Sequence, residues 1–299
     1  MSILVVGSIA LDTVETPNGK ADNSPGGSAL YFSAAASFFA PVNVVGVVGE
    51  DFNFRDIEFL KKRNVDLNGL VVEKGETFRW GGRYHQNMNE RDTLFTYLNV
   101  FETFRPHIPD NYKESRFVFL ANIAPELQLN VLKGISSPLL TILDTMNFWI
   151  SGRREALEKV IKRVDVMILN DEEIRELTGV HNINRAAAQL LQQGPRVLVI
   201  KKGEHGAVLI TEDDYFVAPA FPVSDVIDPT GAGDSFAGGF VGYLASCPEI
   251  NKLELRRAVV YGSTVASFNV ESFSFNRLKA IDKQQIDDRV EQFREMMRF

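Results

Sequence analysis

One carboxylate, Asp234, directly follows three residues with small side chains, Gly231-Ala232-Gly233, and this pattern could carry chemistry. The apolar run behind it predicts a helix capped by Thr230, a good N-cap residue. The first N–H groups of a helix have no partner within it and lie at the positive end of its dipole, so an anion can bind there where side chains are small. A carboxylate in that place repels a phosphate, so anion binding alone does not explain Asp234. It is explained if Asp234 has to take a proton from a hydroxyl that attacks phosphorus. The spacing therefore indicates phosphoryl transfer to a hydroxyl group.

A capped helix with a glycine-rich start is the simpler explanation for a lone G-x-G-D. The longer segment 228–234, D-P-T-G-A-G-D, is more specific. It resembles the C-terminal signature D-T-x-G-A-G-D of the ribokinase-like (PfkB) family of carbohydrate and nucleoside kinases. The resemblance implies that Gly231, Ala232 and Gly233 form an anion hole for the transferred phosphoryl group, and that Asp234 is the catalytic base.

Two further expectations concern the surroundings of this motif. A helix N-terminus favours the charged form of a carboxylate, so we expect the pKa of Asp234 to be lowered. In some members of the family, the loop that corresponds to residues 269–276 helps to bind a monovalent cation. The resemblance therefore makes Asp228 and Thr230 candidates for a monovalent cation site, although this loop lacks the usual R-x-G-A form.

The expected acceptor site is built from the N-terminal segment. Asp12 follows the apolar strand 3–6, and ligands of parallel α/β sheets bind beyond the carboxyl ends of strands. A carboxylate accepts two hydrogen bonds from a vicinal diol, although a turn-capping role fits Asp12 equally well from the residues alone. The resemblance implies that Asp12 binds the acceptor, and that the N–H groups of the G-G pair Gly26-Gly27 contact it. Tyr31 stands where the family often has an asparagine that holds the sugar. Polar residues after strands 117–120 and 139–143 are further candidates, or simple loop caps: Asn122, Asp144 and Asn147.

Residues for ATP and Mg²⁺ are expected in the second half of the chain. Asn170 and Glu173 follow the apolar strand 164–169, where a helix N-cap and its first turn explain both residue types. They also match the family motif N-x-x-E, and this resemblance implies that Asn170 contacts ATP and that Glu173 organises Mg²⁺ through its waters. Mg²⁺ keeps several waters, so few protein ligands are expected. The resemblance implies further ATP contacts in one loop and one helix: Lys201, Lys202, Gly203, Gly206, Gly262 and Ser263.

The composition sets outer limits on the function. The chain has 299 residues, 45% hydrophobic and 24% charged, which is typical of a soluble globular protein. A net charge of −7 argues against a nucleic-acid-binding surface. The single cysteine, Cys247, forms no internal disulfide and suits a cytoplasmic protein. The uncharged run 24–49 reads as a buried helix and strand broken at Pro41, so we expect no membrane contact. The four histidines show no metal-ligand spacing.

The order of expected elements, with apolar strands that alternate with helices, predicts an α/β fold. The resemblance implies one ribokinase-like domain over 1–299, a three-layer α/β/α arrangement with a mostly parallel central sheet and a small β-lid. We place the lid at roughly 12–22 and 72–103, where the aromatic segments 77–80 and 94–97 predict a hairpin. Residues 19–27 are expected to form a turn-rich segment.

These observations predict an ATP-dependent kinase that phosphorylates a hydroxyl of a small sugar or polyol, as a monomer or homodimer. A nucleoside kinase of the same fold is the alternative, in which Tyr31 could stack on a base. A non-catalytic ligand-binding relative is a third reading, and the intact acidic residues speak against it. A nicotinamide dehydrogenase is disfavoured because the first strand leads into G-S-I-A-L-D and not into a G-x-G-x-x-G turn.

Overall fold

A nine-stranded sheet lies at the centre of the computed structural model, which describes residues 1–298. Its strand order is β13-β12-β11-β10-β9-β8-β1-β4-β5, parallel from β11 to β5, with β12 antiparallel to both neighbours. The strands are β1 (Ile3–Val6), β4 (Val42–Gly49), β5 (Val65–Glu73), β8 (Phe117–Leu120), β9 (Leu140–Asp144), β10 (Val166–Asn170), β11 (Val197–Lys201), β12 (Ala207–Ile210) and β13 (Tyr215–Ala218). The expected mostly parallel sheet is confirmed.

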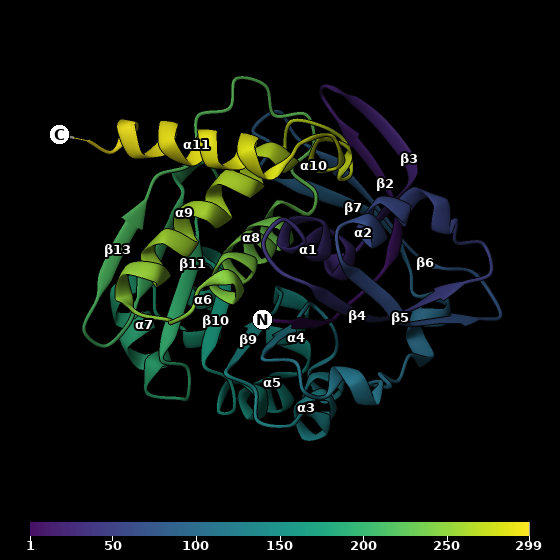
Figure 1. The fold of residues 1–299 in the computed structure, drawn as a ribbon, viewed down its shortest axis with the longest axis horizontal. Coiled ribbons are helices and arrows are strands. Elements are labelled where there is room, and N and C mark those ends of the chain that lie inside the picture. Colours follow the sequence, from purple (N-terminus) through teal and green to yellow (C-terminus); the bar gives the residue numbers. More distant parts are fainter. Residues whose placement is uncertain (299) are drawn as a thin grey trace.

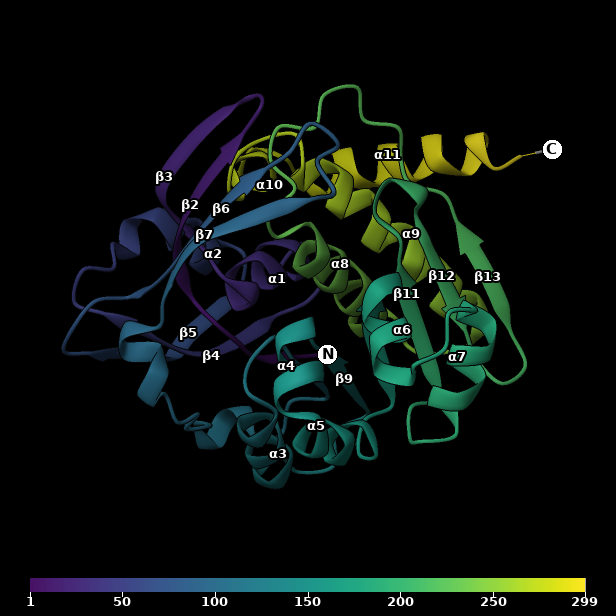
Figure 2. The same cartoon turned by 180° about the vertical axis from the view of Figure 1, so that it is seen from behind.

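Helices cover both faces of this sheet (Figures 1 and 2). One face carries α1 (Ser28–Ala36), α2 (Glu58–Lys62), α8 (Ala232–Ser246), α9 (Lys252–Asn269), α10 (Asn276–Ala280) and α11 (Lys283–Met296). The other carries α3 (Pro125–Gly134), α4 (Asn147–Gly152), α5 (Arg154–Ile161), α6 (Asp171–Thr178) and α7 (Ile183–Leu191). Short 3-10 segments are η1 (Phe54–Ile57), η2 (Asn99–Thr103), η3 (Asp110–Tyr112) and η4 (Gly203–His205).

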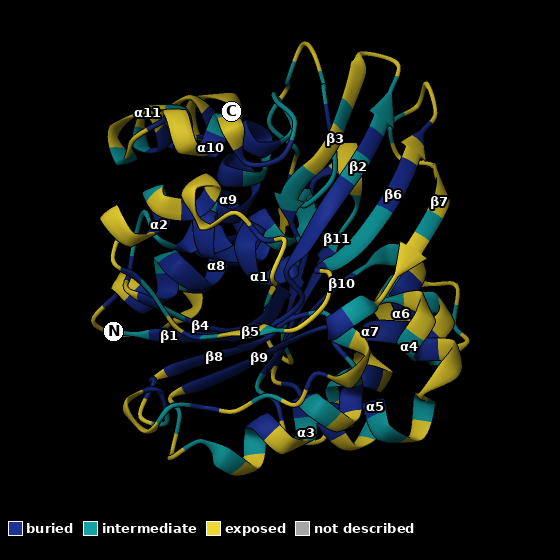
Figure 3. Cartoon of the chain, turned by 90° about the vertical axis from the view of Figure 1, so that its right-hand side faces the viewer, coloured by how far each residue is buried: buried dark blue, intermediate teal, exposed yellow. Residues whose placement is uncertain are grey.

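Each face of the central sheet has its own apolar core, because successive residues of a strand point to opposite faces. In β1, Ile3 and Val5 pack into one core and Leu4 and Val6 into the other, and all four are fully buried. Figure 3 shows the sheet on edge with dark, buried strands between the two helical layers. Within residues 1–298, none of the helices combines the length and the apolar composition needed to cross a lipid bilayer.

A second, smaller sheet, which we call the lid sheet, has the order β3-β2-β6-β7. Its strands are β2 (Ala10–Thr16), β3 (Gly19–Gly26), β6 (Phe78–Tyr84) and β7 (Arg91–Tyr97). The central pair β2–β6 is parallel, whereas β2–β3 and β6–β7 are antiparallel. Figure 3 shows the lid sheet standing up from the large sheet, on the side of α1 and α8.

Two local predictions were wrong. Residues 19–27 are not a turn-rich loop but mostly strand β3, an edge strand whose side chains are largely exposed. Pairing with β2 makes this segment a strand, which its own residue types do not reveal. The N-cap of α8 is Gly231 and not Thr230, because Gly231 adopts a left-handed conformation with φ 74° and leaves Thr230 outside the helix.

The close packing of α8 against α1 gives a first prediction. A Cβ atom at Gly238 would lie 2.4 Å from the carbonyl oxygen of Phe32 and 2.7 Å from the Cβ of Ala35. We expect Gly238→Ala to lower the free energy of unfolding by about 1–3 kcal/mol, because the two helices would have to separate. Thermal and urea unfolding would measure the loss.

Gly152→Ala is the matched control, because no atom lies within 4 Å of a Cβ at this exposed helical position. We expect this variant to gain up to about 1 kcal/mol from helix propensity. Equal stabilities of the two variants would show that helices α1 and α8 tolerate the extra methyl group.

Candidate active site

The N-terminus of α8 presents backbone N–H groups that have no acceptor within the described residues 1–298. The N–H groups of Gly231 and Gly233 make no hydrogen bond there, whereas that of Ala232 donates to the carbonyl oxygen of Pro229 at 3.2 Å. The expected anion hole of three small residues therefore offers two free N–H groups, because the N–H of Ala232 closes the turn that begins at Pro229. Two such groups at the positive end of a 15-residue helix form an anion site.

The loop that leads into α8 is fixed by buried side chains. Asp228 accepts the N–H of Thr230 at 2.8 Å on one oxygen and the N–H of Ser274 at 3.2 Å on the other. Asn269 is fully buried and donates to the carbonyl oxygen of Thr230 at 2.8 Å, while its own oxygen accepts from Ser235 at 3.1 Å. Both carboxylate oxygens of Asp228 thus serve the loop itself. A monovalent cation at Asp228 and Thr230 stays a prediction.

Tyr31 packs beneath the anion site. A Cβ atom at Gly231 would lie 2.3 Å from two carbons of the Tyr31 ring, and the ring also meets Phe275 edge to face at 5.7 Å. Because only 2% of Tyr31 is exposed, the suggestion that it stacks on a nucleobase is wrong. The ring instead supports the peptide of Gly231, so the acceptor side and the phosphate side of the site share one buried contact.

Four charged groups meet at the carboxyl end of the central sheet beside this helix. Lys201 ends β11, Asp144 ends β9, Glu173 lies in the first turn of α6, and Asp234 lies in the first turn of α8. Lys201 Nζ lies 3.5 Å from Asp144 Oδ1 and 3.0 Å from the place that a Cβ of Gly233 would take. The sequence assigned Lys201 to ATP, and the structure brings its amino group next to the anion site.

The electrostatics of this cluster reverse one expectation. Burial, with a contribution from the charge of Asp144, raises the pKa of Asp234 to about 7, so the expected lowering by the helix N-terminus is wrong. Burial likewise raises the pKa of Glu173 to about 7. Burial alone would lower the pKa of Lys201, but Asp144, Glu173 and Asp234 together hold it above its usual value. Lys201 is therefore a charged ammonium group among three carboxyl groups.

Asn170 and Glu173 form a capping box at the start of α6. The side chain of Asn170 accepts the N–H groups of Glu172 and Glu173 at 2.9 and 2.8 Å, and Glu173 Oε2 accepts the N–H of Asn170 at 2.7 Å. Helix capping thus accounts for the N-x-x-E spacing, and it leaves the other oxygen of Glu173 free. Within residues 1–298, no group of three or more His, Cys, Asp or Glu side chains gathers as a metal cage. Glu173 has one oxygen outside the capping box, and Asp144 Oδ1 has Lys201 at 3.5 Å as its charged neighbour, so these two carboxyl groups suit a cation held mainly by phosphates and water.

Asp12 lies in strand β2 of the lid sheet, where burial, and then the charges of the nearby Asp228 and Asp234, raise its pKa. Its side chain is 5% exposed, and burial together with the charge of Asp228 raises its pKa to about 8, against the effect of the Gly27 N–H group. A Cβ atom at Gly26 would lie 2.0 Å from Asp12 Oδ2, and Gly27 has φ 89° with a Cβ position 2.6 Å from the carbonyl oxygen of Ser8. Gly26 therefore makes room for the carboxyl group of Asp12, whereas Gly27 lets the chain pass close to the backbone of residues 8–10.

The side chain of Asn122 is hydrogen-bonded to other residues of the protein. Its oxygen accepts the indole N–H of Trp149 at 2.7 Å, and its amide group contacts Met146 Sδ at 3.0 Å. Asn147 donates to Glu176 at 2.8 Å. The structure thus places Asn122 in a loop network at the end of β8, and a role for Asn122 in acceptor binding stays a prediction.

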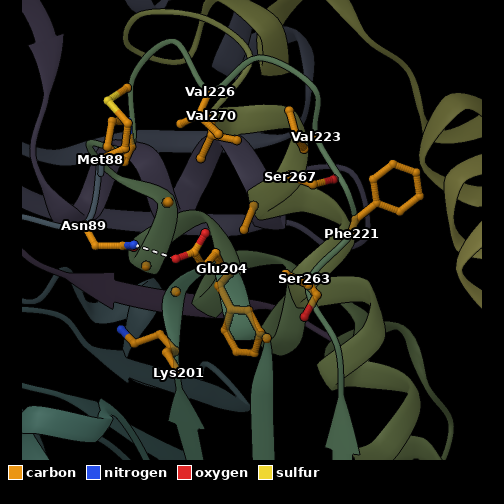
Figure 4. Close-up of a pocket in the computed structure, with 18 of the residues that line it drawn as sticks. Met88, Asn89, Lys201, Glu204, Phe221, Val223, Val226, Ser263, Ser267 and Val270 are labelled. Atoms are coloured by element: carbon orange, nitrogen blue, oxygen red, sulfur yellow. Dashed lines mark hydrogen bonds between the residues drawn. The ribbon is translucent and has the colours of Figure 1, made fainter. Parts of the chain in front are cut away.

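A cavity of about 500 Å³ opens on the other side of the anion site (Figure 4). Of the residues assigned to ATP, Lys201, Gly203, Gly206 and Ser263 line this cavity. Lys202, Asn170 and Gly262 do not line it, and the Cα of Gly262 packs against α8. Apolar side chains from loop 219–227 and from helices α8 and α9 form its walls: Phe221, Val223, Val226, Phe236, Ala266 and Val270. An apolar slot beside an anion site suits a purine base with phosphates.

The turn between β6 and β7 reaches this cavity as well. Asn87, Met88 and Asn89 line it, and the amide of Asn89 donates to Glu204 Oε1 at 3.2 Å (Figure 4). The lid sheet thus carries Asp12 on β2 and also contacts the loop after β11 through Asn89. Sequence reasoning assigned no residue to this contact, because the turn N-M-N-E-R-D carries no recognisable motif.

Sequence reasoning also missed the lid residue nearest to the anion site. Tyr84, at the end of β6, is buried and accepts a hydrogen bond from the hydroxyl of Thr230 at 3.2 Å. The sequence predicted the aromatic hairpin, but it did not predict on which face of the lid sheet each aromatic side chain lies. Alternation within β6 could have grouped Trp80, Gly82 and Tyr84 on one face.

Known proteins are similar to this chain over most of its length. The pfkB family carbohydrate kinase profile matches residues 2–279. A cytidine kinase of Thermococcus kodakarensis is 29% identical over 266 residues, which cover 86% of this chain and 95% of that protein. A nucleoside kinase of Methanothermobacter thermautotrophicus is 32% identical over 275 residues, which cover 88% and 85% of the two chains.

Solved structures share the fold. A crystal structure from E. coli, provisionally named ribokinase II and solved with ATP and Mg²⁺, superposes with a TM-score of 0.80. It is 18% identical and covers 97% of this chain and 99% of its own. At that identity the likeness concerns the fold, and it agrees with the three layers and the lid sheet described above.

The buried carboxyl groups predict how stability depends on pH. A carboxyl group whose pKa is raised in the folded state stabilises the protein fully below its unfolded pKa, and this contribution is lost as the pH rises through the folded pKa. As the pH rises from about 4 to about 8, the protein should therefore lose stability, because the unfolded pKa of both groups is 3.8 and the folded values are about 8 for Asp12 and about 7 for Asp234. Asp12→Asn should raise Tm at pH 9 by roughly 2–4 °C or more, since one pKa unit corresponds to about 1.4 kcal/mol.

Thermal unfolding of both proteins at several pH values would measure this difference. Asp22→Asn is the matched control, because Asp22 is an exposed residue in the same hairpin. A Tm of Asp12→Asn that stays below the wild-type value at all pH values would show that Asp12 is not held as a strained buried acid.

Proposed function

The chain belongs to the pfkB family of carbohydrate kinases and is a phosphotransferase with a hydroxyl acceptor, and from this premise we propose that Asp234 is its catalytic base. The proposal depends on one observation. A partly buried carboxyl group in the first turn of α8 adjoins two free backbone N–H groups and a lysine ammonium group whose side chain is 19% exposed. This arrangement can hold the γ-phosphoryl group of ATP and deprotonate the alcohol that attacks it.

Each part of the site has a distinct task in the transfer. The N–H groups of Gly231 and Gly233 stabilise the charge on the equatorial oxygens of the phosphoryl group, and Lys201 adds a positive charge from the β11 side. Asp234 accepts the proton of the attacking hydroxyl. Phosphoryl transfer passes through a loose transition state, so alignment matters more than base strength. A pKa of about 7 nevertheless suits a base that works near neutral pH.

ATP occupies the 500 Å³ cavity in this proposal, with its base between the apolar walls and its phosphates directed at α8. Mg²⁺, when bound with ATP, would screen the phosphate charge, and Glu173 and Asp144 are the carboxylates placed to hold it or its waters. Gly203 and Gly206 give the nucleotide access to the backbone after β11, while Asn170 acts indirectly by fixing Glu173 through the capping box.

Asp12 is the acceptor-binding group of the proposal, with the backbone at Gly26 and Gly27 beside it. A sugar or polyol hydroxyl is the main acceptor class, and the names of the cytidine kinase and the nucleoside kinase support a nucleoside as the second. We further propose a single kinase domain with the lid at about 12–22 and 72–103, a monomeric or homodimeric cytoplasmic enzyme without nucleic-acid or membrane partners, and a monovalent cation as an optional activator.

Replacement of Asp234 should separate the binding of ATP from the transfer of its phosphoryl group. We expect Asp234→Asn to bind ATP with near wild-type affinity and to lose turnover by about 10³-fold or more, because the proton has no acceptor. In the wild type, kcat/KM should fall as the pH drops below about 7, since protonation removes the base.

Calorimetric ATP titration and a steady-state assay would measure the two effects. Asp225→Asn serves as control because Asp225 is an exposed acid just before the motif. Wild-type turnover in Asp234→Asn would remove Asp234 from the mechanism.

A panel of acceptors tests the reaction itself. Ribose, fructose, 2-deoxyribose, cytidine, uridine and adenosine would each be incubated with ATP and Mg²⁺, and ADP and the phosphorylated product would be measured. At least one member should be phosphorylated, and Asp12→Asn should raise its KM by about 10-fold or more, because an amide group replaces one of the two carboxyl oxygens that can accept the hydroxyls. Failure of every sugar and nucleoside would contradict the proposed acceptor class.

A further inference from the structure

The face of the lid sheet that looks toward the anion site carries four functional side chains. In the β2–β6 pairing Asp12 lies opposite Trp80, and in the β6–β7 pairing Tyr84 lies opposite Arg91. Residues paired in register project to the same face, and Trp80 and Tyr84 share a face because they are four residues apart on one strand. Tyr84 is bonded to Thr230 beside the anion site, so this inner face is the acceptor side.

The indole of Trp80 lies on this face and is not buried in a core. A Cβ atom at Gly82 would lie 2.2 Å from Cη2 and 2.6 Å from Cζ2 of the indole, so the ring occupies the space that Gly82 leaves open. Trp80 is only partly buried, and the guanidinium of Arg91 lies 5.7 Å from its ring centroid. Within residues 1–298, Arg91 has no carboxylate within ion-pair distance.

The other aromatic side chains nearby are engaged elsewhere. Tyr31 is buried under Gly231, and Tyr84 is buried and hydrogen-bonded. Phe95 covers Gly81, whose side of β6 is the outer face, and stacks there on Tyr97 at 5.1 Å. Phe78, on the same face of β6 as Trp80, stacks on Phe101 at 5.4 Å. Trp80 is partly buried, and Arg91 over its ring is its partner within residues 1–298.

We propose that Trp80 and Arg91 form a nucleobase subsite, so that the preferred acceptor is a nucleoside. The base stacks on the indole, Arg91 donates hydrogen bonds to carbonyl or ring-nitrogen acceptors on the edge of the base, and Asp12 binds the ribose hydroxyls. Arg91 has donors and no acceptor, which favours a base rich in acceptor atoms. This inference rests on the proposed function, because it takes Asp12 as the residue that binds hydroxyls.

The magnitude of base stacking makes the subsite measurable. Removal of an aromatic partner of a base reduces affinity by about 5- to 100-fold. A free sugar has no planar base and gains nothing from the indole. The subsite therefore predicts a selective loss, with nucleosides affected and ribose unaffected.

The kinetic test compares Trp80→Ala and Gly82→Ala with Tyr97→Ala, a control on the exposed outer face of the same hairpin. We expect Trp80→Ala to reduce kcat/KM for cytidine, uridine or adenosine by about 10- to 100-fold through KM, with kcat/KM for ribose within about twofold of the wild type. Gly82→Ala should produce the same pattern, because its methyl group displaces the ring without removing it. Tyr97→Ala should change neither, and Tm would confirm that all variants fold.

A binding test keeps this inference separate from catalysis. Trp80 is one of two tryptophans, so the double variant Trp149→Phe, Asp234→Asn reports on Trp80 fluorescence without turnover. Nucleosides should quench the emission and ribose should not. Absence of quenching, or equal losses for ribose and nucleosides in Trp80→Ala, would overturn the subsite. Ribose phosphorylation by the wild type would still uphold the proposed function in that case.

Discussion

The burial of several carboxyl groups around one lysine is the constraint on which the site depends. Asp144, Glu173 and Asp234 lie where water is largely excluded, and each has a raised pKa. Such a concentration of acid is tolerable because Lys201 adds a positive charge and because the N-terminus of α8 adds a partial one. The same features suit the incoming phosphate, whose negative charge meets Lys201 and free N–H groups. A magnesium-bound nucleotide would suit the same cluster, because its cation offsets the charge of the carboxylates.

Close approach of backbone to side chain joins the acceptor side to the phosphate side. Gly26 makes room for the carboxylate of Asp12, and Gly231 makes room for the ring of Tyr31. Ser274 extends the connection through two hydrogen bonds. Its N–H donates to the carboxylate of Asp228, and its hydroxyl donates to the carbonyl oxygen of Pro25. The segment around Asp12 and Pro25 is therefore joined to the loop before α8 by direct contacts, which in the proposed function would align the acceptor for an in-line transfer.

The lid sheet adds the variable part of the site. The register between β2 and β6 decides which side chains share the face with Asp12. The turn between β6 and β7 contacts the loop after β11 through Asn89 and Glu204. In the proposed function, this one sheet would border both substrates, so its closure over one could depend on the other. Substitution of a few inward residues on such a sheet can change the acceptor without any change at Asp234.

The sequence by itself determined the α/β fold and the helix that starts at the D-P-T-G-A-G-D motif, because strand periodicity, small residues and capping patterns act over a few neighbouring positions. The family resemblance added Asp12, Asn170, Glu173 and Asp234 as candidate site residues, and their roles stay proposals. The sequence did not determine the conformation of residues 19–27, the use of Ala232 in a turn, the burial of Tyr31 or the direction of the pKa shift of Asp234. Those features arise from contacts between segments that are far apart in the chain, such as Tyr31 with Gly231 and Lys201 with Asp144. Burial and charge are properties of the packed assembly, so only the tertiary structure could decide them.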